Sequence, residues 1–280
     1  MAKTKSRTDA DANAVVKVQG VNAALLKYAE QDKSLAGMDE YRILPRIKLI
    51  QAMADQDLKK AFGEGTAIIR PGDAVVWKEG DEDFKFVPLL FVVEFAQWAD
   101  LQDNEQNTVI ARSFDPTSVI ARKARDPKGR YEPYPNGSEM KYRFVEHLRF
   151  YGFIYGEHAL VGTPVVLSFE RGEFTQGKNF ISAIKLRRTQ VTDESGTRMI
   201  PLPLWSQVWA FRVGFRDKSK DRRWYGLDFK LPETPVIKDD EIEFFHSQHI
   251  ELADLQAKNR LLVDERDKDV VETSGDNTEM

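Results

Sequence analysis

The chain has 280 residues, of which 41% are hydrophobic, and it contains no cysteine. This length and composition predict a globular protein with a sizeable core. The absence of cysteine excludes disulfides and cysteine-ligated metal, and it favours a reducing compartment. The charged start at residues 1–9 leads into no apolar segment of a secretory signal, and the longest apolar run, residues 86–95, is shorter than the about 20 residues that span a bilayer. We therefore expect a cytoplasmic protein with no membrane partner.

The net charge of −4 is an average over unlike parts of the chain. Residues 171–223 hold 12 basic residues against 5 acidic ones, whereas residues 232–280 hold 5 basic against 14 acidic. Such asymmetry predicts a basic surface together with an acidic tail.

The N-terminal half predicts a flexible arm followed by a β-rich domain. Residues 1–37 form the arm, with a short helix expected at 21–36, and residues 38–236 form the domain. We expect strands at 41–50, 66–70 and 74–77, and a helix at 55–62. Residues 84–98 are apolar at both odd- and even-numbered positions, which predicts a central strand buried on both faces.

The segment 112–137 is long and interrupted by proline and glycine. We expect a short helix at 117–124 and a loop over the rest, and long loops in compact domains are often functional. Cations and tyrosines gather in this segment: Arg122, Lys123, Arg125, Lys128, Arg130, Tyr131 and Tyr134.

Residues 141–156 fit either a helix or a strand, and the glycines and aromatic residues favour a strand in the second half. As a strand, Phe144, Leu148, Phe150 and Ile154 face the core. The opposite parity then faces solvent: Arg143, Arg149, Tyr151 and Tyr155.

Residues 163–231 are interpreted as a run of strands with an apolar face and a basic, aromatic face, because side chains alternate across a strand. Two of these strands are expected at 180–188 and 205–216, and a hairpin turn at Gly177 with positive φ precedes them. The open face of the run carries Lys185, Arg187, Arg212, Arg216, Arg222 and Trp224, and Lys178 stands at the turn. Cations that contact phosphates and a ring that stacks on a base suit single-stranded nucleic acid.

Other chemistry is less well supported. Residues 172–178 match the spacing of a phosphate-binding loop, but Asn179 stands where that loop needs Ser or Thr, and the residues that follow alternate like a strand. Asp73, Asp83 and Lys85 loosely match a magnesium-dependent nuclease, at a spacing that is often met by chance. His246 and His249 lack further zinc ligands nearby in the sequence. We expect no cofactor and no metal.

The C-terminal region predicts a helix at 237–262, with acidic residues at its start and an apolar stripe. Residues 263–280 are expected to be a disordered acidic tail. This tail has two interpretations: it keeps the protein soluble, or it mimics nucleic acid, covering the basic groove or docking on replication proteins.

Several segments together resemble bacteriophage single-stranded-DNA-binding proteins built on an OB-fold. They are residues 43–49 (ILPRIKL), 164–169 (PVVLSF), 176–184 (QGKNFISAI), the late tryptophans Trp205, Trp209 and Trp224, and the acidic C-terminus. The resemblance implies a mainly β fold, a five-stranded Greek-key barrel with added helices. It also implies a role in protecting single strands during replication or recombination.

Three hypotheses follow. The first is an OB-like barrel that binds single-stranded DNA without sequence preference or catalysis, and its binding residues are Arg149, Tyr151, Tyr155, Lys178, Lys185, Arg187, Arg212, Arg216, Arg222 and Trp224. The second is a magnesium-dependent nuclease or other DNA-processing enzyme. The third is a virion or assembly protein whose arm and terminal helix mediate contacts in a homo-oligomer.

Overall fold

The structure is a computed structural model that describes residues 43–54, 56–100, 108–133, 141–193, 196–219, 222–258 and 260–263. The predicted arm at 1–37, its helix at 21–36, and all of the predicted tail except Val263 lie outside the described residues. So do Tyr134 and the side chain of Arg222.

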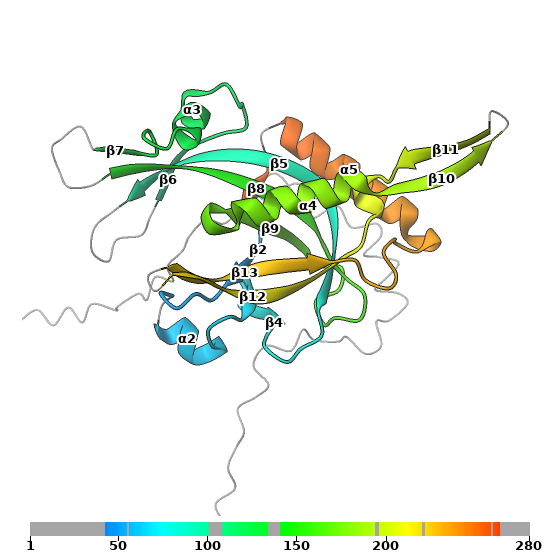
Figure 1. The fold of residues 1–280 in the computed structure, drawn as a ribbon, viewed down its shortest axis with the longest axis horizontal. Coiled ribbons are helices and arrows are strands. Elements are labelled where there is room, and N and C mark those ends of the chain that lie inside the picture. Colours follow the sequence, from blue (N-terminus) through cyan, green and yellow to red (C-terminus); the bar gives the residue numbers. More distant parts are fainter. Residues whose placement is uncertain are drawn as a thin grey trace, which may run out of the picture. The chain divides into compact units, whose positions relative to one another are not determined.

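The described elements are mainly strands (Figure 1). In chain order they are β1 (Ile43–Leu44), β2 (Arg46–Leu49), α2 (Gln56–Phe62), β3 (Ala67–Arg70), β4 (Ala74–Trp77), β5 (Phe84–Asp100), β6 (Thr108–Ser113), α3 (Val119–Arg125), β7 (Tyr131–Pro133), β8 (Lys141–Tyr155), β9 (Pro164–Glu170), η2 (Arg171–Glu173), α4 (Phe174–Leu186), β10 (Arg188–Asp193), β11 (Gly196–Pro201), η3 (Leu204–Ser206), β12 (Trp209–Ser219), β13 (Arg222–Lys230), η4 (Asp239–Glu241), α5 (Ile242–Ala257) and β14 (Leu262–Val263).

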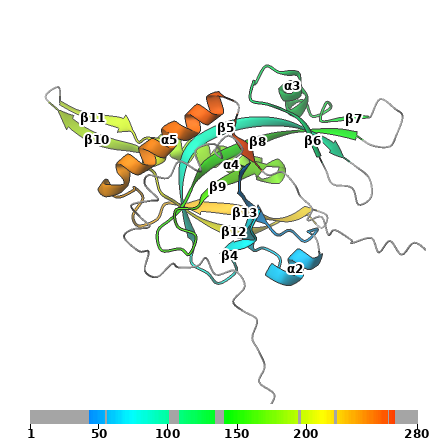
Figure 2. The ribbon, with the colours of Figure 1, turned by 180° about the vertical axis from the view of Figure 1, so that it is seen from behind.

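One curved sheet contains most of these strands, in the order β13-β12-β5-β8-β9-β2-β3-β4, with β6 added to β5 and β7 to β8 (Figure 2). Its centre is the long antiparallel pair β5 and β8, in which Lys85 faces Tyr155 at one end and Asp100 faces Lys141 at the other. The only parallel pair within this sheet, among the described strands, joins β2 to β9 at Arg46 and Val166. The expectation of a mainly β fold is confirmed, and so are the strand at 84–98 and the strand interpretation of 141–156.

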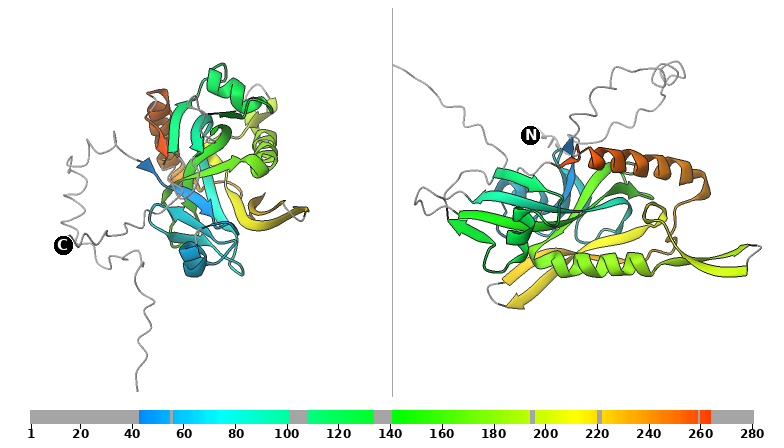
Figure 3. Two further views of the ribbon diagram at one scale, coloured as in Figure 1. Left: turned by 90° about the vertical axis from the view of Figure 1, so that its left-hand side faces the viewer. Right: turned by 90° about the horizontal axis from the view of Figure 1, so that it is seen from above.

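The sheet lies between two helices, α4 on one face and α5 on the other (Figure 3, right). Phe180 of α4 is fully buried, and its ring packs within about 6 Å of five other rings. Phe245 and Leu252 of α5 join a second core with Tyr151 and Phe153. Because β5 and β8 are covered on both faces, both of their parities carry apolar side chains.

The prediction of a strand at 180–188 is wrong, because residues 174–186 form α4. Ile184 fits both a strand and a helix pattern when counted from Phe180, so the local pattern is ambiguous. The helix is the form that places Phe180 among the rings of the first core, and it leaves Leu186 78% exposed.

Gly177 lies in α4, so the prediction of a hairpin turn there is wrong too. A Cβ atom at this position would stand 2.7 Å from Cβ of Phe169 and 2.8 Å from Cδ1 of Leu148. Glycine at this position therefore lets α4 approach the sheet closely.

A bulge in β5 changes the predicted faces of the central strand. The register with β8 shifts between Pro88 and Leu90. Before the bulge Val87 and Leu89 belong to the core beneath α5, and after it Phe91 and Val93 pack on the core beneath α4. A strict period of two would place all four on one face, and one extra residue in the strand is enough to move the later pair to the other face.

Candidate nucleic-acid interface

Two of the predicted binding residues are inside the protein. Arg149 is 1% exposed and Tyr151 is 0% exposed. Nη2 of Arg149 lies 3.3 Å from Oε1 of the fully buried Glu94. The prediction that these side chains face solvent is wrong, because the face of β8 that carries them is covered rather than open.

Two more of the predicted binding residues, Arg187 and Tyr155, form hydrogen bonds with the C-terminal segment. Nη1 of Arg187 donates to the carbonyl of Pro235 at 2.8 Å, and burial lowers the pKa of Arg187. The hydroxyl of Tyr155 donates to Oε2 of Glu241 at 2.7 Å. Burial, and then the hydrogen bond and charge of Glu241, raise the pKa of Tyr155 to about 12.

Arg216 and Trp224 meet at the carboxylate of Glu173. This carboxylate accepts from Nε and Nη2 of Arg216 at 3.2 and 3.3 Å, from Nε1 of Trp224 at 2.8 Å and from the backbone N–H of Leu227 at 3.1 Å. Burial lowers the pKa of Arg216, but hydrogen bonds and charges from Asp228 and Glu173 outweigh it, so that the pKa is raised. Glu173 thus fixes the β12–β13 hairpin to η2.

The remaining predicted cations do not share one face of a sheet. Lys178 and Lys185 are exposed on α4, and Arg212 is exposed on β12 opposite Asp228. Nζ of Lys178 lies 4.8 Å above the centre of the Phe174 ring. The nine predicted residues whose side chains the structure describes therefore do not converge into one trough, although Lys178 lies over the ring of Phe174 and Trp224 lies beside Gly172, both next to the site described below.

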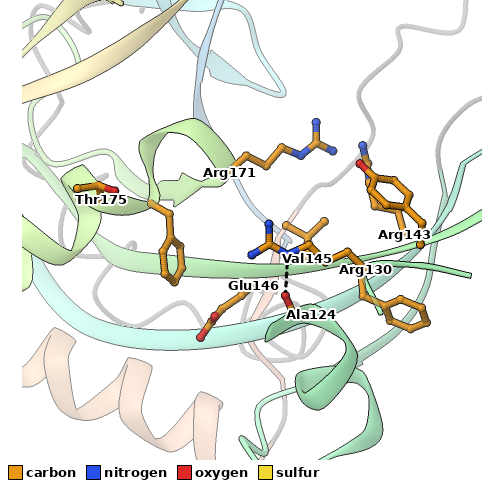
Figure 4. Close-up of a pocket in the computed structure, with 10 residues that line it drawn as sticks. Ala124, Arg130, Arg143, Val145, Glu146, Arg171 and Thr175 are labelled. Atoms are coloured by element: carbon orange, nitrogen blue, oxygen red, sulfur yellow. Dashed lines mark hydrogen bonds between the residues drawn. The ribbon is translucent and has the colours of Figure 1, made fainter. Parts of the chain in front are cut away.

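Three other arginines come together around a cavity of about 470 Å³ (Figure 4). Arg130 precedes β7, Arg143 lies on β8 and Arg171 opens η2. Figure 4 shows the side chains of Arg171 and Arg143 extending toward one another, with Arg130 between them and Ala124. We call this cavity the arginine pocket; it is lined by Ala124, Arg130, Tyr131, Arg143, Phe144, Val145, Glu146, Arg171, Phe174 and Thr175.

Each arginine is held differently. Nε of Arg130 donates to the carbonyl of Ala124 at 3.2 Å, so the loop before β7 is tied to the end of α3. The guanidinium of Arg143 lies 5.5 Å from the centre of the Trp98 ring. The guanidinium of Arg171 makes no hydrogen bond or ion pair with any described residue, and its backbone has φ of 47°. A positive φ is strained for arginine, and such strain is often found at functional sites.

The pocket stays cationic because its acidic neighbour is already paired. Glu146 accepts from Nη2 of Arg125 at 3.0 Å and from Nε at 3.3 Å. Beside this pair, Lys123 of α3 pairs with Glu132 of β7. Arg171, which has no hydrogen bond or ion pair with a described residue, therefore has charge to offer to an external anion.

Rings complete the pocket. Tyr131 is 58% exposed at its rim, and Phe174 is half-buried at the start of α4. On the other side of η2, a Cβ atom at Gly172 would stand 2.9 Å from Trp224, so this indole lies beside the residue that follows Arg171. Tyr131 is the most exposed of the three rings and is the one available for contact with a flat ligand.

The two carboxylates of the nuclease hypothesis, Asp73 and Asp83, pair with cations in separate turns. Oδ1 of Asp73 lies 2.7 Å from Nη1 of Arg70, and Oδ2 of Asp83 lies 2.6 Å from Nζ of Lys230. Within the described ranges, no group of three or more metal-ligating side chains is placed to hold an ion. The match to a phosphate-binding loop does not form that loop, because Gly177 and Lys178 lie inside α4.

The sequence signal for the arginine pocket was present but divided. The cations and tyrosines of segment 112–137 had been noted as a group, and Arg143 had been assigned to an outward face. Arg171 was assigned to no site, because nothing local places it near Arg143, which is 28 positions earlier in the chain. Only the pairing of β8 with β9 brings the two arginines together.

None of the described helices is long and apolar enough to cross a membrane. Comparisons with curated proteins and with solved structures give no match. A family model described as Pam3 phage gp34-like protein matches residues 16–247, which include every element from β1 to β13 and the start of α5. The chain therefore belongs to the family of Pam3 phage gp34-like proteins.

Proposed function

We propose that this protein binds single-stranded DNA without sequence preference, as a non-catalytic protein of phage DNA replication or recombination. The observation that carries the proposal is the convergence of Arg130, Arg143 and Arg171 on one pocket whose rim bears Tyr131. Guanidinium groups bind phosphates in a bidentate manner, and aromatic rings stack on bases of any sequence.

The order of the strands supports an OB-like architecture. An OB-fold is a five-stranded, partly open Greek-key barrel, and a Greek key has the spatial strand order 4-1-2-3. If β5, β8, β9, β12 and β13 are numbered one to five, the order β12-β5-β8-β9 is that of a Greek key, β13 is the fifth strand, and α4 lies between the third and the fourth.

The closure of this barrel-like sheet uses an added N-terminal segment. β2 pairs in parallel with β9. This is the edge at which the fifth strand, here β13, would close the barrel of an OB-fold. Shortly after β2, Nε2 of Gln51 donates to the carbonyl of Tyr225 at 2.8 Å, and Oε1 accepts from its N–H at 2.8 Å. Gln51 thereby bridges the end of β2 to β13.

The position of the arginine pocket supports the proposal, because it matches the surface through which OB-folds bind nucleic acid. That surface is formed by strands two and three with the loops after strands one and four. In this numbering, the pocket lies between the insertion that carries α3 and β7 and the end of β9, and the β12–β13 hairpin stands next to it through Trp224. Single-stranded DNA bound at this site would run from Tyr131 past Arg171 to Trp224.

The test is fluorescence anisotropy with labelled oligo-dT at several salt concentrations. For single strands, log K falls with log [salt] with a slope of about −0.7 for each phosphate neutralised. We expect Arg143→Gln and Arg171→Gln each to weaken binding and to flatten the slope. The matched control is Arg188→Gln, an exposed arginine on β10, which should leave both unchanged. Lack of binding at low salt, or equal affinities for all three variants, would refute the proposal.

A second candidate, an assembly protein, rests on exposed apolar side chains of α5. Ile242, Phe244 and Ile250 are 41%, 49% and 53% exposed. Sizing chromatography without DNA tests this candidate, which requires an oligomer whose formation is prevented by Phe244→Ser. Incubating the anisotropy samples with Mg²⁺ tests the nuclease hypothesis in the same experiment, because it requires metal-dependent shortening of the oligonucleotide.

A further inference from the structure

The arginine pocket opens at a break in the pairing of β8. β7 pairs with β8 at residues 141–143, and β9 pairs with it at residues 147–153. Residues 144–146 lie between these two partners, and all three of them line the pocket. The cavity is therefore sunk into the edge of the sheet, with α3 and β7 on one side and η2 with α4 on the other.

The size and lining of the pocket suit a small ligand rather than a stretch of polymer. A volume of about 470 Å³ lies in the lower part of the range of small-molecule sites, about 300–1,000 Å³. Three arginines line it, while Phe144, Val145 and Phe174 contribute apolar surface. Such a combination matches a single nucleotide, which has an anionic phosphate and a flat, largely apolar base.

We propose that the arginine pocket takes one nucleotide of the bound strand out of its stack. This inference rests on the proposed function and specifies how that site binds its ligand. Arg143 and Arg171 hold the phosphates that flank the nucleotide, and the base lies against Tyr131 at the rim. Unstacking costs least when the strand is unpaired, so the pocket selects single strands over duplexes.

The proposal separates two contributions to binding that can be measured independently. If Tyr131 contacts a base, its effect must depend on the presence of bases in the ligand. If Arg143 and Arg171 contact phosphates, their effects must persist when the bases are removed. A ligand of the same length and charge without bases distinguishes these cases.

The experiment compares oligo-dT with an abasic deoxyribose-phosphate strand of equal length. Tyr131→Ala should weaken binding of oligo-dT by about 5- to 150-fold, the range for loss of one stacking contact. It should leave the affinity for the abasic strand unchanged. Arg143→Gln and Arg171→Gln should weaken binding of both strands. Phe244→Ala is the control for loss of an exposed ring and should affect neither, because Phe244 lies on α5.

Photocrosslinking locates the base directly. Oligo-dT that carries 5-bromodeoxyuridine should crosslink to the peptide containing Tyr131 or to the one containing Phe174. Equal weakening of both strands by Tyr131→Ala, or no weakening of either, would overturn the inference while leaving single-strand binding intact. Failure of the unaltered protein to bind oligo-dT would instead refute the proposed function. Circular dichroism of each variant confirms that it is folded.

Discussion

Replacing Glu173 by glutamine tests whether this one carboxylate fixes the β12–β13 hairpin beside the arginine pocket. Its side chain is 14% exposed and that of Arg216 is 21% exposed, so both groups are largely shielded from water. Glutamine keeps the shape of the side chain, but it loses the charge, and its NH₂ group cannot accept a hydrogen bond. At least one of the two hydrogen bonds from Arg216 must then be lost.

The expected cost follows from the type of bond. A hydrogen bond to a charged group contributes about 1.5–3 kcal/mol. Because some water reaches the pair, we take the lower part of this range and expect a loss of about 2 kcal/mol in the free energy of unfolding. For a chain of this size, that corresponds to a decrease in Tm of roughly 4–8 °C.

Denaturant unfolding followed by circular dichroism measures this loss. Glu157→Gln is the matched control, because it is the same chemical change at an exposed residue that makes no side-chain hydrogen bond or ion pair with a described residue. Trp224 should also change its fluorescence in Glu173→Gln, since its indole N–H donates to this carboxylate. A loss no larger than that of the control, below about 0.5 kcal/mol, would show that the hairpin is held by packing alone.

Three further predictions concern stability. Gly177→Ala should destabilise the protein by about 1–3 kcal/mol in denaturant unfolding, because the added methyl group overpacks α4 against the sheet. The control is Ser182→Ala, at an exposed site on the same helix, and an equal loss of stability in both variants would contradict this prediction. Burial opposes ionisation of Glu170, but the charges around it lower its pKa from 4.5 to about 2, so its contribution to stability is present above pH 4.5 and is lost as the pH falls toward 2. Glu170→Gln should reduce the difference in melting temperature between pH 6 and pH 3, and an unchanged difference would refute this assignment. Tyr155→Phe removes the hydrogen bond to Glu241 and should lower the free energy of unfolding by about 1 kcal/mol. In the unaltered protein, an absorbance titration should show Tyr155 ionising near pH 12.

The charge surrounding Glu170 explains why its pKa is low although burial opposes ionisation. Nδ1 of His147 lies 2.8 Å from its carboxylate, and the charges of Arg46 and Arg149 act in the same direction. Arg149 also reaches Glu94. The buried arginine that had been expected to contact DNA thus takes part in a polar network within the covered side of the sheet.

The sequence alone determined the features that depend on local pattern. The apolar residues at both parities of 84–98 required a strand with covered faces, and β5 has them. The alternation at 141–156 placed Phe144, Leu148, Phe150 and Ile154 in the core, where all four are buried. The acidic start and apolar positions of the C-terminal helix were also sufficient to predict α5, although the structure ends it at Ala257.

The tertiary structure decided which faces are open and which distant residues meet. Periodicity tells which side chains share a face of β8, but whether that face is covered depends on other elements, and Arg149 and Tyr151 are therefore buried. The segment around Phe180 fits two periods, and the cluster of rings that selects the helix comes from strands far away in the chain. The convergence of Arg130, Arg143 and Arg171 depends on the pairing of β8 with β7 and β9, and no local pattern encodes these long-range pairings.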